Sequence, residues 1–158
     1  MLDTLRKLIS EIAGGDEPAR LFQDNDYRLA AAALMVHLIS VDGHTSEAET
    51  RKLKALLQSR FSLDAAAADE LVREATIVEG ESVDLYGFTS LILRAVDEPG
   101  RLRIVEMMWE IVFADGKVNE FEESVIWRAA DLLGISSRDR VELRQRVAAA
   151  QTAAPGPA

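Results

Sequence analysis

Two stretches decide the fold: SVDGHTSEAE at residues 40–49 and FADGKVNEFEE at residues 113–123. Each follows a segment that is apolar on nearly every side, and each carries an Asp-Gly pair three residues before a Ser or Asn. Glycine adopts the left-handed geometry that ends a helix. A Ser or Asn with Glu three positions later forms a capping box that starts one. Both stretches therefore predict the same unit: a buried helix, an Asp-Gly turn and an acid-led helix.

The two units are related by a shift of 73 positions, from Asp42-Gly43 to Asp115-Gly116. The shift aligns about two dozen residues without a gap, and most apolar positions fall on apolar positions in both central helices. The acidic positions recur as well: Glu47 falls on Glu120 and Glu49 on Glu122. We interpret the pattern as an internal duplication, with the two central helices packed near a pseudo-two-fold axis.

The remaining sequence predicts only helices. Asp64 and Ser82 are candidate N-caps, Gly80 and Gly134 are candidate helix ends, and Asp97-Glu98-Pro99-Gly100 is typical of a helix start. No alternating strand pattern competes. We predict an all-α fold, a compact bundle of about seven or eight helices. The predicted parts are an amphipathic helix with an acidic loop at 1–25, a helical domain at 26–150 and a disordered tail at 151–158.

Composition excludes several classes of function. The net charge of −9 argues against nucleic-acid binding, because phosphate contacts need clustered Lys and Arg. The chain has no cysteine, which excludes disulfides, thiolate metal sites and cysteine nucleophiles. No apolar run approaches the roughly 20 residues of a membrane-spanning helix. In the absence of such a run, we predict a cytoplasmic location by default. No catalytic constellation is evident, so we also predict that the protein is not an enzyme.

The Asp-Gly acids have two explanations. A carboxylate at a helix C-terminus lies against the negative end of the helix dipole, so another interaction must offset the resulting repulsion. It can turn toward the amides of the next helix, in which case the loop is purely structural. It can instead hold a divalent cation such as calcium or magnesium, since these ions prefer oxygen ligands. The candidate metal ligands are Asp42, Glu49, Asp115 and Glu122.

Other polar residues lie near these acids or inside the apolar helices. Glu47 and Glu120, beside the candidate ligands, could support the site. His37 and Glu110 occupy equivalent positions in the two central helices, where they could be hydrogen-bonded core residues, support a metal site, or contact each other. Lys117 would repel a cation, which weakens the metal hypothesis for the second loop.

The paired Asp-Gly-x-x-(Ser/Asn)-Glu-x-Glu motifs resemble the TerB family of tellurite-resistance proteins. RLAAAALMV at 28–36, DLYGFT at 84–89 and AADLLGIS at 129–136 are similar to short, stand-alone bacterial members of that family. The resemblance spans residues 26–147. It implies an all-helical fold, acidic residues that bind metal ions, and a link to stress responses and to membrane-associated or chaperone complexes.

Two functional hypotheses remain open at this point. The first is a non-enzymatic module for protein interaction, in a stress-response context, whose fold needs no metal. The second is a domain that binds or senses a divalent cation through the two Asp-Gly loops. The sequence names neither the protein partner nor the oligomeric state, monomer or homodimer.

Overall fold

The computed structural model describes residues 21–41, 43, 46–81 and 84–153, and over these residues the all-α prediction is confirmed. The described residues form seven helices and no strand. The helices are α2 (Tyr27–Ser40), α3 (Glu47–Arg60), α4 (Ala65–Glu81), α5 (Leu85–Ala95), α6 (Glu98–Val112), α7 (Glu120–Leu132) and α8 (Ser137–Ala153). None of them is long and apolar enough to cross a membrane.

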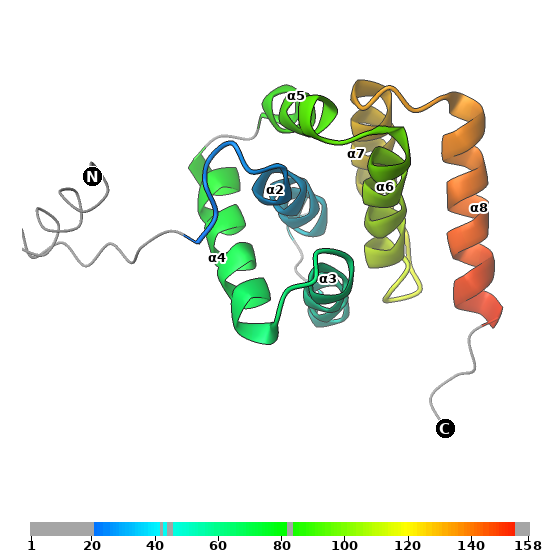
Figure 1. Ribbon diagram of the computed structural model, residues 1–158. Helices are drawn as coiled ribbons and strands as arrows, with labels where there is room; N and C mark the ends of the chain where they lie inside the picture. The colour runs from blue at the N-terminus through cyan, green and yellow to red at the C-terminus, as the bar shows by residue number, and fades with distance from the viewer. Residues whose placement is uncertain (1–20, 42, 44–45, 82–83, 154–158) are drawn as a thin grey trace, which may run out of the picture.

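Helix α2 lies inside the bundle, as its all-round apolar sequence predicts. It contacts α3, α4, α5, α6 and α7 (Figure 1). The stretch from Leu29 to Met35 is buried along its whole length. The helix starts at Asp26, whose Oδ1 accepts a hydrogen bond from the Arg28 amide at 2.9 Å.

Helix α6 is the second centre of the bundle. It contacts α2, α3 and α7, and α8 packs on it at the side away from α2 (Figure 1). Trp109 is fully buried, and Leu143 and Val147 of α8 are nearly so. The two halves of the chain therefore share one hydrophobic core.

The helix ends mostly follow the predicted signals. Gly43, Gly116 and Gly134 have φ values of +82°, +78° and +73°, the left-handed region that glycine adopts without strain. The Gly43 amide bonds the Ser40 carbonyl, and the Gly116 amide bonds the Phe113 carbonyl, each at 3.0 Å. This recurrence matches the shift of 73 positions, while the duplication itself stays a prediction.

Helix α4 departs from the prediction. It continues through Gly80 to Glu81, although we expected a break near Gly80. Glycine costs a helix only about 1 kcal/mol, which packing of the rest of α4 offsets. The next helix is capped by Asp84, whose Oδ1 accepts from the Gly87 amide at 2.9 Å. The predicted cap Ser82 lies outside the described residues.

Two of the predicted parts lie largely outside the described residues. These are the amphipathic helix and most of the acidic loop, up to residue 20, and the tail from residue 154. Helix α8 extends to Ala153, three residues past the predicted end of the helical domain.

Candidate functional site

The second acid-led helix carries a complete capping box. The Glu122 amide donates to Asn119 Oδ1 at 2.8 Å, and the Asn119 amide donates to Glu122 Oε1 at 3.3 Å. The Glu122 side chain is only 3% exposed. The capping prediction is confirmed for α7, and this local structure fixes one Glu122 oxygen at the start of the helix.

The first acid-led helix is capped in a different way. Ser46 Oγ accepts from the Glu49 amide at 3.3 Å, as predicted. The reciprocal bond from the Ser46 amide to the Glu49 carboxylate is not formed, so the predicted box is incomplete in α3. Glu49 is nevertheless buried, with 5% exposure, and its Oε2 has no hydrogen-bond donor among the described residues. Its carboxyl group is therefore available for another partner.

That partner comes from the other unit. The Glu49 carboxyl lies close enough to the carboxyl groups of Glu122 and Asp115 for their charges to act on it. Burial, together with the negative charges of Glu122 and Asp115, raises the pKa of Glu49 from 4.5 to about 9. Two buried carboxylates in contact repel each other unless a proton or a cation lies between them. We call Glu49 and Glu122 the inter-unit acid pair.

Asp115 lies at the rim of this pair. It is exposed, and its Oδ1 accepts from the Lys117 amide at 3.0 Å. The carboxylate thus turns toward its own loop, and not toward the amides at the start of α7 that the structural explanation of the Asp-Gly acids predicts. Asp42, the equivalent candidate ligand, lies outside the described residues.

The acid pair is not a finished metal centre. Within residues 21–41, 43, 46–81 and 84–153, no group of three or more histidine or acidic side chains is arranged so that it could hold a metal ion. Glu47 and Glu120 are exposed at the starts of α3 and α7. Of the predicted ligands, Glu122 and Asp115 each lie near Glu49, and only the two glutamates are buried.

Of the three alternatives for His37 and Glu110, the structure supports hydrogen-bonded residues and contradicts a contact between the two. His37 Nδ1 lies 3.3 Å from Glu79 Oε1 on α4, and Glu110 Oε1 lies 3.4 Å from the Arg60 guanidinium at the end of α3. The two residues therefore do not contact each other. Each pairs with a charge from a neighbouring helix, and neither pairing involves the acid pair.

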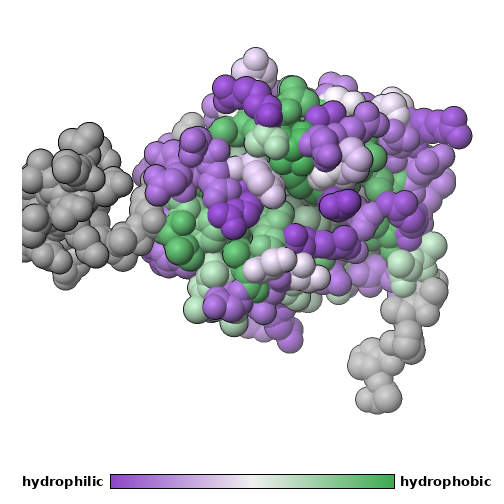
Figure 2. All heavy atoms as spheres, viewed as in Figure 1, coloured by the Kyte–Doolittle hydropathy of each residue, from purple (hydrophilic) through white to green (hydrophobic). Residues whose placement is uncertain are grey.

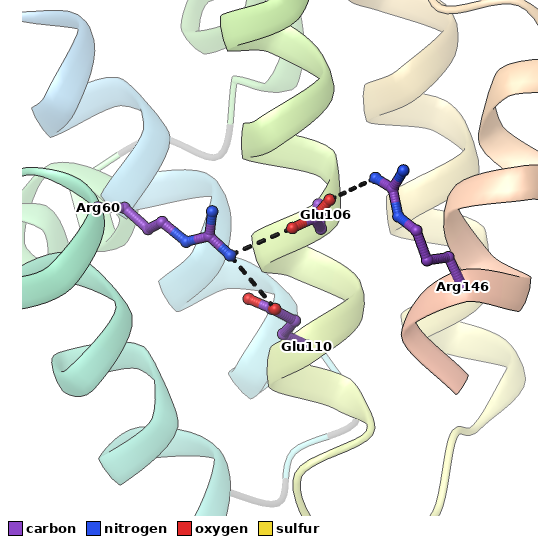
Figure 3. A network of polar contacts seen from close by, with 4 residues as sticks. All are labelled: Arg60, Glu106, Glu110 and Arg146. Carbon is purple, nitrogen blue, oxygen red and sulfur yellow. Dashed lines mark hydrogen bonds and ion pairs between the residues drawn. The ribbon is translucent and has the colours of Figure 1, made fainter. Parts of the chain in front are cut away.

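A charged network at α6 was not predicted. Glu106 pairs with Arg60 of α3 at 3.1 Å and with Arg146 of α8 at 2.6 Å, as Figure 3 shows. We call Arg60, Glu106, Glu110 and Arg146 the α6 ion network. Glu106 and Glu110 do stand out in the sequence as acids within an apolar helix. Their arginine partners lie 46 and 40 residues from Glu106, a distance at which no local pattern operates.

Comparisons with known proteins give one match. The family model described as tellurite resistance protein TerB matches residues 28–145, most of the chain. The comparison with curated proteins and the comparison with solved structures found no match. The matched region includes all seven described helices except the first residue of α2 and the end of α8.

Proposed function

The chain belongs to the TerB family, and we propose that it binds a divalent cation at the inter-unit acid pair. The observation that carries the proposal is the burial of Glu49 and Glu122 against each other, one from each helix–turn–helix unit. An apolar pair at these positions would pack without repulsion. Burying two carboxyl groups side by side costs free energy, and such a cost persists in a protein mainly where the groups have a function.

Carboxylate oxygens suit calcium and magnesium. A cation between Glu49 and Glu122 would displace the proton that the raised pKa of Glu49 retains there, and it would attract both carboxylates. It would also supply the partner that Glu49 Oε2 lacks among the described residues. Because one glutamate comes from α3 and the other from α7, the cation would tie the two units together.

The proposal requires a rearrangement, because the described acids alone do not form a ligand group of three. Asp115 must turn from the Lys117 amide toward the pair, or Asp42 of the first loop must contribute. Lys117 follows Asp115 closely in the loop and opposes the first of these changes. We expect binding of modest affinity, as in sites with few charged ligands.

Calorimetric titration of the full chain with calcium, magnesium, manganese and zinc tests the proposal. We expect saturable heat for at least one ion, together with a higher melting temperature. Glu49→Gln and Glu122→Gln should abolish both signals. Glu47→Gln and Glu120→Gln, which remove exposed acids next to the pair, should leave them intact. No heat at millimolar metal and an unchanged melting temperature would overturn the proposal.

A second candidate function, a non-enzymatic module for protein interaction, is favoured by the surface of α5. Tyr86 and Leu93 are 72% and 44% exposed and lie seven positions apart, so they share one face of the helix. On the face drawn in Figure 2, hydrophobic side chains reach the surface at the top of the view, where α5 lies in Figure 1. Exposed aromatic residues are enriched in protein interfaces.

This candidate predicts that the double variant Tyr86→Ser, Leu93→Ser loses a partner that the parent chain retains, with an unchanged melting temperature. Ile77→Ser on α4, which removes an exposed apolar residue elsewhere, serves as the control. If the parent chain, the double variant and Ile77→Ser all retained the partner equally, the α5 face would not be the binding surface. The absence of catalysis, the stress-response context and a cytoplasmic location remain predictions from the sequence.

A further inference from the structure

A pocket of about 300 Å³ lies at the junction of four helices, away from the inter-unit acid pair. Its walls come from the start of α2, the end of α3, the residue after α5, and one face of α6. Gly100, Arg103, Ile104 and Met107 follow one another at spacings of three, one and three, so they lie on one side of α6. A volume of this size is at the lower end of the range for small-ligand pockets.

The pocket combines aromatic and aliphatic walls. The ring of Tyr27 meets the ring of Phe61 edge to face, with centroids 5.9 Å apart and an interplanar angle of 85°. Ile104 and Met107, which also line the pocket, are buried. Aromatic edges and a polarisable thioether favour a flat, unsaturated ligand over a compact polar one.

The polar lining of the pocket carries one available positive charge. Arg60 lines the wall, but its guanidinium is held by Glu106 and Glu110 in the α6 ion network (Figure 3). Arg103, in contrast, is exposed and forms no ion pair with any described residue. No acidic side chain lines the pocket, although the chain has 27 acidic residues. A guanidinium beside apolar walls is suited to a carboxylate, which it binds through two parallel hydrogen bonds.

We propose that this pocket binds a small aromatic carboxylate, its ring against Tyr27, Phe61 and Met107 and its carboxylate on Arg103. The net charge of −9 opposes the approach of an anion at long range. The affinity is therefore modest, and the local contact with Arg103 is decisive. This binding is separate from the cation site, since none of the residues of the acid pair lines the pocket.

The test uses the full chain labelled with ¹⁵N and titrated with 2-naphthoate, followed by two-dimensional amide spectra. We expect saturable shifts at the amides of Gly100, Arg103 and Met107, with Kd about 0.1–1 mM. The neutral isostere 2-naphthamide should bind about tenfold more weakly, because it lacks the charge that Arg103 recognises.

Arg103→Gln should weaken 2-naphthoate about tenfold while leaving 2-naphthamide unchanged. Since Arg103 is exposed, this variant is expected to fold like the parent. Arg128→Gln, an exposed arginine of α7 that does not line the pocket, is the matched control and should bind like the parent. The proposal fails if no shifts appear at about 5 mM ligand, if the shifts map elsewhere, or if Arg103→Gln binds 2-naphthoate as the parent does.

Discussion

The two helix–turn–helix units differ most at their matched capping glutamates. In α7, Glu122 accepts a hydrogen bond from the backbone amide of its cap, Asn119, at 3.3 Å. In α3, Glu49 occupies the same position and does not bond the Ser46 amide; it faces Glu122 and Asp115 of the other unit. The capping glutamate of α7 therefore bonds within its own motif, whereas the capping glutamate of α3 faces the other unit. A local sequence signal specifies where a helix starts, but packing decides what the capping side chain does afterwards.

The central helices differ as well. Ala33 of α2 is fully buried, whereas the equivalent Glu106 of α6 carries two ion pairs. The reason lies in their neighbours. Helix α2 contacts five helices and Ala33 is enclosed among them, while α6 meets arginines from α3 and α8 at its borders. Both units supply the core, and the second also joins it to the charged outer helix α8.

The substitutions with the largest expected effect test whether both units contribute equally to one hydrophobic core. Met35→Ala and Met108→Ala remove fully buried side chains at equivalent positions of α2 and α6. Each should lower the free energy of unfolding by about 2–5 kcal/mol, through lost burial and the cavity left behind. Urea unfolding followed by tryptophan fluorescence measures both losses.

Arg128→Ala, at an exposed site of α7, is the control and should change stability by less than about 0.5 kcal/mol. If Met108→Ala matched this control while Met35→Ala did not, the core would be confined to the first unit. Two separate unfolding transitions would likewise contradict a single shared core.

The fold was predictable because its signals are local. Apolar runs, the caps Asp64 and Asn119, and the glycines at 43, 116 and 134 each act within a few residues, and the structure confirms the helices they predict. The failures have the same origin. Gly80 reads as a break in isolation, yet it lies inside α4 because the flanking residues continue the helix.

The second prediction concerns the pH dependence of the acid pair. In the folded chain the pKa of Glu49 is raised to about 9, above its ordinary value of 4.5. The folded state therefore holds a proton that the unfolded state has released between these values. Stability from this group is fully present below pH 4.5 and is lost as the pH rises toward 9.

Glu49→Gln should remove that part of the pH dependence, since the amide stays neutral in both states. At pH 8 it should raise the free energy of unfolding by about 1–3 kcal/mol, and at pH 4 it should change it little. Thermal unfolding from pH 4 to pH 9.5 measures the difference. Glu47→Gln, at the exposed position two residues earlier, should follow the parent curve. Parallel curves for the parent and Glu49→Gln would show that Glu49 titrates normally.

The third prediction compares the two Asp-Gly turns directly. Gly43→Ala and Gly116→Ala should each destabilise the chain by about 1–2 kcal/mol, because both glycines have positive φ. The expected losses are similar because neither position has a neighbour within 4 Å of a new Cβ. Chemical denaturation measures both.

Gly80→Ala provides the matched control. Gly80 lies within α4 and also has open space around it, so alanine there should stabilise by about 0.5–1 kcal/mol. If all three substitutions changed stability alike, backbone conformation would not explain the recurrence of glycine in the two turns.

The site was less predictable than the fold, because its contacts join distant residues. The sequence picked out Glu49 and Glu122 through their place in a repeated motif, but nothing in it indicated that the two side chains meet. His37 and Glu110 were paired by their equivalent positions, whereas the structure pairs them with Glu79 and Arg60. Equivalence in a repeat predicts similar backbone geometry and does not predict side-chain partners.

The smallest expected effect comes from a substitution that gives the second unit the residue of the first unit at one position. Glu106→Ala places in α6 the residue that α2 has at Ala33, and it removes the ion pairs to Arg60 and Arg146. Because these pairs are partly exposed, the loss should be about 1 kcal/mol or less and should shrink in high salt. Glu142→Ala, which removes an exposed ion pair within α8, should cost less than about 0.5 kcal/mol. A loss for Glu106→Ala that did not respond to salt would assign Glu106 a packing role, and α6 would then resemble α2 more closely than its charges indicate.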